Sequence, residues 1–187
     1  MKLKIVKFKS VTSTNDEAIK LIRSDRCFLG LVFTYSQIRG RGTMGKKWIS
    51  YKGNIFISIF FKVNLIKIKI ENYLIINAKI IQKILNEYTQ KIVKIKKPND
   101  LLIDGKKICG ILQEVIDHKK EKYLIIGIGI NTKISPLNKN FKSTSLKINS
   151  SKNISNKIII EKIIKNYNKL IYDINNHNSL YVKKKYR

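Results

Sequence analysis

A loop of glycines and cations gives the clearest chemical signal in the sequence. Glycine occurs at positions 40, 42 and 45, and arginine or lysine occurs at positions 39, 41, 46 and 47. Because glycine has no side chain and tolerates positive φ, such a loop can bring backbone N–H groups and positive charges close to a phosphate. The loop therefore predicts a phosphate-binding site.

A second stretch places lysine beside a rigid bend. Proline restricts the backbone, and here two lysines precede it while an amide and a carboxylate follow it. The residues are Lys96-Lys97-Pro98-Asn99-Asp100, and the run over residues 107–114 comes shortly after them. Together with the glycine loop, this stretch predicts a phosphate-handling active site.

Apolar patterning predicts the elements that must position these two stretches. Apolar segments rich in β-branched residues predict strands over residues 4–8, 29–35, 54–61, 93–96, 101–103, 107–116 and 123–130. Helical spacing predicts helices ending near residue 24 and spanning residues 71–88 and 158–174. The apolar face of the second helix is predicted to consist of Leu74, Ile75, Ala78, Ile81, Ile84 and Leu85. The order of elements predicts an α+β domain whose mixed, mainly antiparallel sheet is flanked by helices and covered on one side.

Short-range signals predict how several elements begin and end. Thr14 and Glu17 predict a capping box at the start of the first helix. Asp104-Gly105 predicts a type I′ hairpin turn, and residues 119–121 predict another turn.

Other segments depart from regular patterning. Gly127 and Gly129, inside a predicted strand, indicate close approach by another group. Residues 131–156 are polar and predict a loop with one short helical turn. The basic tail over residues 181–187 is predicted to be loose.

The composition predicts one domain with a substantial core. The chain has 187 residues, of which 43% are hydrophobic. No apolar run is long enough to span a bilayer. Lys7 and Lys9 interrupt the first apolar stretch, so it does not predict a signal peptide. We therefore expect a single cytoplasmic domain over residues 1–187 without a membrane partner.

The formal net charge of +27 has two explanations. Basic proteins are attracted to nucleic acids, so a nucleic-acid-binding module is one hypothesis. The other is compositional drift, because Lys, Ile and Asn are abundant throughout, as an AT-rich coding sequence would produce. A nucleic-acid footprint clusters on one face, whereas these lysines are spread over nearly every segment, so drift is favoured.

The cysteines and histidines predict no site. Cys27 and Cys109 lie in apolar stretches and are expected to be buried, since two isolated cysteines suit neither a disulfide framework nor a metal site. His118 and His177 have no partner at metal-ligand spacing.

Four blocks in order resemble the catalytic domain of the biotin–protein ligase family, the biotin–[acetyl-CoA-carboxylase] ligases. The blocks are Ser13-Thr14-Asn15, Gln37 with Gly40-Arg41-Gly42 and Trp48, Lys96-Lys97-Pro98-Asn99-Asp100 with Gly110-Ile111-Leu112, and Gly127-Ile128-Gly129-Ile130-Asn131. One glycine loop alone is a weak signal, but four ordered blocks over residues 13–131 are specific. The resemblance implies a fold similar to class II aminoacyl-tRNA synthetases.

The resemblance implies an enzyme that activates biotin with ATP. Biotin's carboxylate would attack the α-phosphate to give biotinyl-5′-AMP and pyrophosphate. A lysine of a biotin carboxyl carrier protein, a subunit of acetyl-CoA carboxylase, would then displace AMP. Mg²⁺ is expected with ATP, held mainly by phosphates and waters rather than by protein ligands.

The resemblance also implies site residues. Lys96 and Arg41 are expected to be catalytic, because cations are needed where two anions meet. The expected biotin-binding residues are Ser13, Thr14, Asn15, Gln37, Gly40, Arg41, Gly42, Thr43, Lys96, Gly110 and Ile111. The expected ATP-binding residues are Arg41, Trp48, Lys96, Asn99 and Asn131, with Trp48 stacked on adenine. Asp100 is expected to orient the Lys96 segment. Simple helix capping by Ser13 and Thr14, and core packing by Trp48, are the structural alternatives.

Two positions depart from the family pattern. Thr43 stands where relatives commonly have arginine, so adenylate retention is expected to be weaker unless Lys46 or Lys47 compensates. Lys97 replaces an aromatic residue near the biotin site.

The resemblance also bears on domains and partners. A winged helix-turn-helix before Ser13 and a C-terminal SH3-like domain are not expected. We therefore expect a monofunctional ligase without specific DNA binding, whose copies can pair sheets side by side. A lipoate-protein ligase-like acyltransferase is the alternative with the same fold, although the Gly-Arg-Gly loop and the Lys96 block favour biotin.

Overall fold

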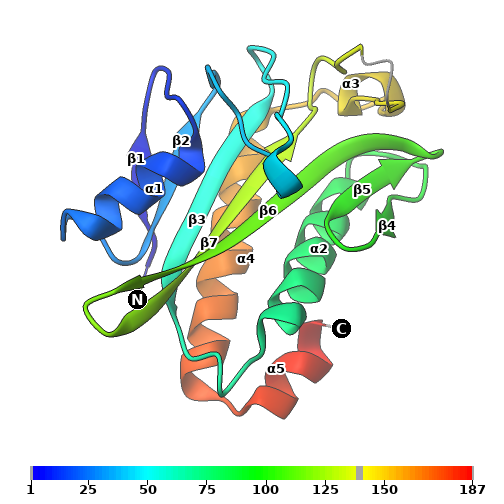
Figure 1. Ribbon diagram of the computed structural model, residues 1–187. Coiled ribbons are helices and arrows are strands. Elements are labelled where there is room, and N and C mark those ends of the chain that lie inside the picture. The colour runs from blue at the N-terminus through cyan, green and yellow to red at the C-terminus, as the bar shows by residue number, and fades with distance from the viewer. Residues whose placement is uncertain (1, 138–140, 187) are drawn as a thin grey trace.

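A seven-stranded sheet forms the centre of the computed structural model, which describes residues 2–137 and 141–186 (Figure 1). The strands lie in the order β1-β2-β3-β7-β6-β5-β4. Their bounds are β1 Lys4–Lys7, β2 Gly30–Thr34, β3 Ile55–Val63, β4 Lys94–Lys96, β5 Asp100–Ile103, β6 Lys106–His118 and β7 Glu121–Ile130. The β1–β2 pair is parallel and the other five pairs are antiparallel, which confirms the predicted mixed sheet.

The central strands are apolar on both faces because helices pack against both. In β3 only Lys62 is exposed, and β3 pairs with β7 from Ile55↔Ile130 to Val63↔Lys122. Strand alternation sends Ile57, Ile59 and Phe61 to one face and Phe60 to the other. This central pair gives the site a rigid floor.

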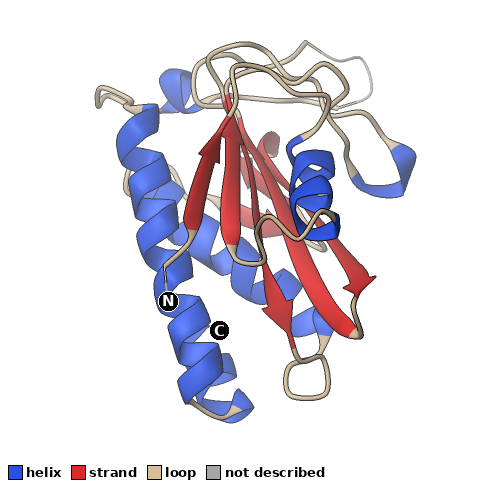
Figure 2. Cartoon of the chain, turned by 90° about the vertical axis from the view of Figure 1, so that its left-hand side faces the viewer, coloured by secondary structure: helices blue, strands red, loops and turns tan. Residues whose placement is uncertain are grey.

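Helices lie on both sides of the sheet (Figure 2). Their bounds are α1 Thr14–Arg23, α2 Ile70–Asn86, α3 Leu146–Asn149, α4 Asn156–Asn176 and α5 Ser179–Tyr186. Helices α2 and α4 pack on one face and form the larger core with it. On the other face, Ala18 and Ile22 of α1 are buried against Val32, Phe60 and Ile125. The prediction that only one side is covered is therefore wrong, since amphipathic α1 covers part of the second face.

The predicted hairpin turns are confirmed. Asp104 and Gly105 have φ of 49° and 73°, and Lys119 and Lys120 have φ of 48° and 64°. Two successive positive φ values are the signature of a type I′ turn. The first turn joins β5 to β6, and the second joins β6 to β7, so both turns help to set the register of the strands that carry the site.

The predicted capping box at α1 is wrong. Ser13 is the N-cap residue, and its side chain makes no capping hydrogen bond to the helix. Thr14 is instead the first helical residue, and its hydroxyl donates to Gln37 Oε1. Simple capping therefore does not explain the two hydroxyl residues.

The C-terminal tail is helical rather than loose. In α5, Val182 is fully buried and Tyr186 Oη donates to Asp173 Oδ2 of α4 over 2.8 Å. These tertiary contacts hold a helix that its own weak amphipathic pattern does not predict. Arg187, at the end of the predicted loose tail, lies outside the described residues.

The predictions for the other segments are largely confirmed. The predicted short helical turn is α3, while residues 138–140 of the predicted loop lie outside the described residues. On α2, Ile75 is 41% exposed and Tyr73, Ile76 and Ile80 are buried, so the apolar face is rotated from the predicted one. Both cysteines are buried, as predicted. None of the helices in the described residues combines the length and apolar character that a membrane crossing requires.

Candidate active site

A cavity of about 730 Å³ lies where the glycine loop meets the sheet and the start of α1. Every site residue predicted from the sequence lines it, except Gly40. Gly40 is buried beside the cavity, and a Cβ there would lie 2.6 Å from the Trp48 carbonyl oxygen, so only glycine fits. Segments remote in sequence thus share one concave site of the size typical for small-molecule ligands.

The start of α1 forms a preorganised polar corner. The Thr14 amide and hydroxyl both donate to Gln37 Oε1, over 2.8 and 3.1 Å. Gln37 Nε2 donates to Ser50 Oγ over 3.1 Å, so both ends of this amide are oriented. Buried Ser58 Oγ lies 2.8 Å from Thr14 Oγ1 and also contacts Asn15 Oδ1. Such hydroxyls and amides can pair with a neutral polar ring that carries both donors and acceptors.

Ser58 was not predicted from the sequence. It is the one hydroxyl in the apolar run of β3, where it is fully buried between hydrophobic neighbours. A lone polar residue in a buried strand needs a hydrogen-bond partner, and that signal pointed to a partner outside the strand. The structure supplies Thr14 and Asn15.

Arg41 is held by two carboxylates. Its guanidinium makes a bidentate pair with Glu114, over 2.8 and 2.6 Å, and Nη2 also lies 2.8 Å from Asp16 Oδ1. Asn15 Nδ2 donates to Glu114 Oε2 over 2.7 Å. The hydrogen bonds to Glu114 raise the pKa of Arg41 above its usual value, despite the opposing effect of partial burial. Neither Asp16 nor Glu114 was predicted from the sequence.

Trp48 lies flat against two glycines of the sheet. A Cβ at Gly110 would come 2.6 Å from Trp48 Cζ3, and one at Gly129 would come 2.5 Å from Cε2. Any side chain at either position would displace the indole. The close approach predicted for Gly129 is therefore confirmed, and the group is Trp48. A Cβ at Gly127 would collide with Asn15, which confirms the same prediction there.

The indole also carries an unused donor. Trp48 Nε1 is buried and has no hydrogen-bond partner among residues 2–137 and 141–186. A buried N–H without a partner is costly unless a ligand satisfies it. Trp48 thus offers a ring face and one donor at the cavity wall.

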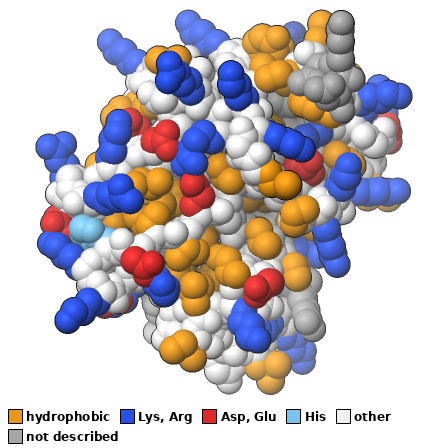
Figure 3. All heavy atoms as spheres, viewed as in Figure 1, with side chains coloured by type: hydrophobic (Ala, Val, Ile, Leu, Met, Phe, Trp, Pro, Cys, Tyr) orange, Lys and Arg blue, Asp and Glu red, His pale blue; other side chains and the backbone are white. Residues whose placement is uncertain are grey.

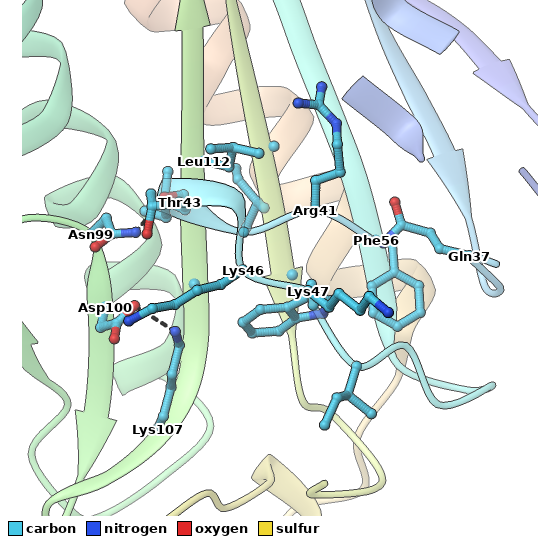
Figure 4. Close-up of a pocket in the computed structure, with 18 of the residues that line it drawn as sticks. Gln37, Arg41, Thr43, Lys46, Lys47, Phe56, Asn99, Asp100, Lys107 and Leu112 are labelled. Carbon is cyan, nitrogen blue, oxygen red and sulfur yellow. Dashed lines mark hydrogen bonds and ion pairs between the residues drawn. The ribbon is translucent and has the colours of Figure 1, made fainter. Parts of the chain in front are cut away.

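Lys107 is the most firmly positioned ammonium group at the cavity. Its Nζ forms an ion pair with Asp100 Oδ1 (dashed line in Figure 4) over 2.7 Å, and it lies 5.2 Å from the centre of the Trp48 ring. The backbone of Lys107 bonds in both directions with a neighbouring loop, donating to the Lys142 carbonyl and accepting from the Thr144 amide, each over 2.9 Å. Sequence reasoning noted the run that begins at Lys107 but gave this residue no role.

Lys96 lines the same cavity from the end of β4, but its side chain is exposed. Asp100 pairs with Lys107 of β6 rather than with Lys96, and its role in orienting the Lys96 segment stays a prediction. Asn99 ties the Lys96 segment to β6 through Ile111. Its Nδ2 donates to the Ile111 carbonyl over 3.0 Å, and its carbonyl accepts from the Ile111 amide over 2.9 Å.

Asn131 also lines the cavity and is buried. Its amide donates to the Ile108 carbonyl, and its carbonyl accepts from the Leu146 amide, each over 2.9 Å. Its Oδ1 lies 3.5 Å from Asn54 Nδ2. These bonds fix the wall but leave the Asn131 side chain among the groups that line the cavity.

The cavity wall is strongly cationic. The cations that line it are Arg41, Lys46, Lys47, Lys96 and Lys107, and Asp100 is the single carboxylate among the lining residues that the structure describes. Lys46 and Lys47 extend in opposite directions from the loop, with Lys46 directed toward Asp100 and Lys107 (Figure 4). This arrangement attracts anions and can stabilise negative charge that develops between them.

No protein cage for a metal is evident within residues 2–137 and 141–186, where no three His, Cys, Asp or Glu side chains come together. Asp100, the carboxylate at the cavity, is already paired with Lys107. Mg²⁺ usually keeps several waters and binds with the phosphates of a nucleotide. The residues present therefore fit Mg²⁺ carried by ATP, which stays a prediction.

Comparison with known proteins gives the site a context. Residues 7–131 match the biotin/lipoate A/B protein ligase family. A biotin protein ligase from Aquifex aeolicus in complex with biotin and ATP is similar, with a TM-score of 0.76 and 24% identity over 94% of this chain and 73% of that chain.

Two further solved structures share the fold. A biotin protein ligase from Leishmania major in complex with biotinyl-5-AMP gives a TM-score of 0.77 and 24% identity, covering 98% of this chain and 79% of that chain. A bipartite lipoate protein ligase from Thermoplasma acidophilum gives 0.62 and 10% identity, covering 92% and 84%. Identities this low support the shared fold alone.

Proposed function

The chain belongs to the biotin/lipoate A/B protein ligase family, and on this premise we propose that it is a biotin–protein ligase. It would activate biotin with ATP to biotinyl-5′-AMP and then transfer biotin to a lysine of a biotin carboxyl carrier protein, in the cytoplasm. One observation carries this proposal: residues from all four predicted blocks line a single cationic cavity. The similar structures contain biotin with ATP and biotinyl-5-AMP, and we propose the same ligands for this cavity.

In the first step, an oxygen of the biotin carboxylate forms a bond to the α-phosphorus, and the bond to the pyrophosphate oxygen breaks. Two anions approach each other, so the barrier falls if cations are already in place. Lys107 is the best-placed group, because Asp100 and Trp48 fix its ammonium. Lys96 and the loop lysines add attraction from the rim.

The other groups would bind and orient the substrates. The corner made by Thr14, Gln37 and Ser58 suits the ureido ring of biotin, which carries both N–H groups and a carbonyl. Trp48 offers its face and its free Nε1–H to the nucleotide. Once the loop lies over the acyl-phosphate, water is excluded from a bond that it would otherwise hydrolyse.

A direct assay separates biotin from lipoate. The purified protein is incubated with MgATP and either biotin or lipoate, and acyl-AMP and pyrophosphate are measured by mass spectrometry and a coupled assay. We expect biotinyl-AMP, and biotin on a lysine of an added biotin carboxyl carrier domain. Lipoyl-AMP in place of biotinyl-AMP would identify a lipoate ligase and overturn the proposal, as would the absence of either product.

A further inference from the structure

Glu114 connects the two halves of the site. It lies on β6, two residues beyond Leu112 on the same face of the strand, and its side chain is 25% exposed. One oxygen accepts from Arg41 Nη1 of the glycine loop, and the other accepts from both Arg41 Nη2 and Asn15 Nδ2. A single carboxylate therefore ties the loop to the sheet and to the start of α1.

The same contacts use most of the hydrogen-bond donors of Arg41 within the protein. Its guanidinium faces two carboxylates, Glu114 and Asp16, and a planar fork that is paired in this way has few donors left for a phosphate. Figure 4 shows Arg41 pointing away from Lys46 and Lys47, on the opposite side of the loop. The lysines can thus supply the positive charge that pairs with the phosphates of the nucleotide, whereas Arg41 holds the loop in place.

We propose that Glu114, assisted by Asp16, is a positioning residue that holds the glycine loop closed over the cavity through Arg41 before any ligand binds. At its start the loop is tied to the segment before α1, where Ile38 and Arg39 donate to the carbonyls of Val11 and Thr12, each over 2.9 Å. From residue 41 onward its backbone bonds are internal. Gly42 donates to the Lys46 carbonyl over 2.7 Å and Trp48 donates to the Gly40 carbonyl over 2.8 Å, and both bonds lie within the loop. The Arg41 pair therefore fixes where this later part of the loop sits relative to the sheet.

The chain contains a reporter for this loop. Trp48 is the single tryptophan, it follows the loop directly, and its indole lies on Gly110 and Gly129. If the loop leaves the sheet, the indole becomes exposed to water. Its fluorescence emission then moves to longer wavelength, without any ligand or catalytic activity being needed.

Glu114→Gln tests the proposal, with Glu121→Gln as a matched control because Glu121 pairs with Lys62 on the neighbouring strand, over 2.6 Å. For ligand-free Glu114→Gln we expect red-shifted Trp48 emission. For the proposed reaction we expect the KM for biotin to rise about tenfold, a value that allows for partial exposure of the pair. The kcat at saturating biotin should change less than about threefold, since bound ligand closes the loop. The control should match the wild type in all three.

Arg41→Lys gives a second test, because lysine keeps the charge but cannot form the fork; it should show the same red shift and the same rise in KM. Unchanged emission in both variants, or a fall in kcat with unchanged KM, would overturn the positioning role. The KM prediction rests on the proposed function, whereas the emission prediction does not. A wild-type protein that makes no biotinyl-AMP would therefore refute the function, and the emission of the variants would still decide the role of Glu114.

Discussion

Removal of the Lys107 charge should slow adenylate formation far more than removal of any neighbouring lysine. Lys107→Met keeps most of the length and the apolar stem but removes the ammonium. At an effective dielectric of about 20, a unit charge about 4 Å from a phosphate oxygen contributes about 4 kcal/mol. The Lys107 side chain is 22% exposed, which lowers this figure modestly. We therefore expect a loss of roughly 10²- to 10³-fold in the rate of biotinyl-AMP formation, the range typical of one preorganised group.

The assay is single-turnover formation of biotinyl-AMP at saturating MgATP and biotin, so that binding and chemistry are separated. Lys106→Met is the control, because Lys106 is the adjacent lysine and is exposed. Lys96→Met is measured in parallel. Lys96 lines the cavity but is exposed, so the loss of rate at saturating substrates should be smaller. A titration with ATP should instead show a raised KM for ATP.

Two results would refute this reasoning. A Lys107→Met rate within about threefold of the wild type would show that the position next to Asp100 and Trp48 is not where charge develops. A larger loss for Lys96→Met than for Lys107→Met would return the catalytic role to Lys96, as the sequence predicted. Circular dichroism of each variant shows whether the fold is intact, since Asp100 loses its ion-pair partner in Lys107→Met.

Three further changes have definite expected outcomes. Gly129→Ala should displace the indole of Trp48, raising the KM for ATP and lowering the free energy of unfolding by about 1–3 kcal/mol in urea titrations; an unchanged Trp48 emission would contradict the packing. Ser58→Ala should weaken biotin binding by about tenfold in calorimetry, because Thr14 and Asn15 lose a buried partner; wild-type affinity would exclude Ser58 from the corner. Asp173→Asn should loosen α5 at a cost of about 1–3 kcal/mol. Burial alone would raise the pKa of Asp173, but hydrogen bonds from Lys185 and Tyr186 lower it below 3.8, so the stabilisation is present above that pH and is lost as pH falls through the depressed pKa. Thermal melts from pH 6 to pH 2 should show this loss in the wild type and not in the variant.

Local signals predicted the fold well where the cause is local. Asp104-Gly105 supplies two residues that tolerate positive φ, so the turn could be predicted without knowledge of its surroundings. Helix α5 could not, because its stability comes from Val182 burial and from the contacts with Asp173, which depend on how α4 is placed. The capping prediction failed for a related reason: Thr14 found a better partner in Gln37, remote in sequence.

The site follows the same division. The glycine loop and the Lys96 block are contiguous, so their chemistry is visible in the sequence. The Arg41–Glu114 pair joins residues 73 positions apart, and no pattern in either segment predicts contact with the other. One signal was available: Gly110, Leu112 and Glu114 alternate along one strand, so the face that carries the predicted site residue Gly110 also carries this carboxylate.

The net charge of +27 therefore indicates little about function. The positions of the few cations at the cavity indicate more. On the face in Figure 3, lysine and arginine side chains are scattered around the molecule rather than gathered over one element, which favours drift in composition over a nucleic-acid footprint. The lysines that line the cavity are of two kinds, which differ in how firmly each ammonium is held. Lys107 is paired and fixed, so it needs little reorganisation when a phosphate arrives.

The loop and rim lysines form the second kind. Lys46, Lys47 and Lys96 make no ion pair with the residues that the structure describes, and all three are exposed. Such charges capture anions from solution, and salt screens their effect. Thr43 supplies no charge of its own, but the loop that carries it presents two exposed lysines, Lys46 and Lys47, to the same cavity. Adenylate retention should accordingly weaken as salt rises, whereas the rate of adenylate formation once both substrates are bound, which depends on Lys107, should change little.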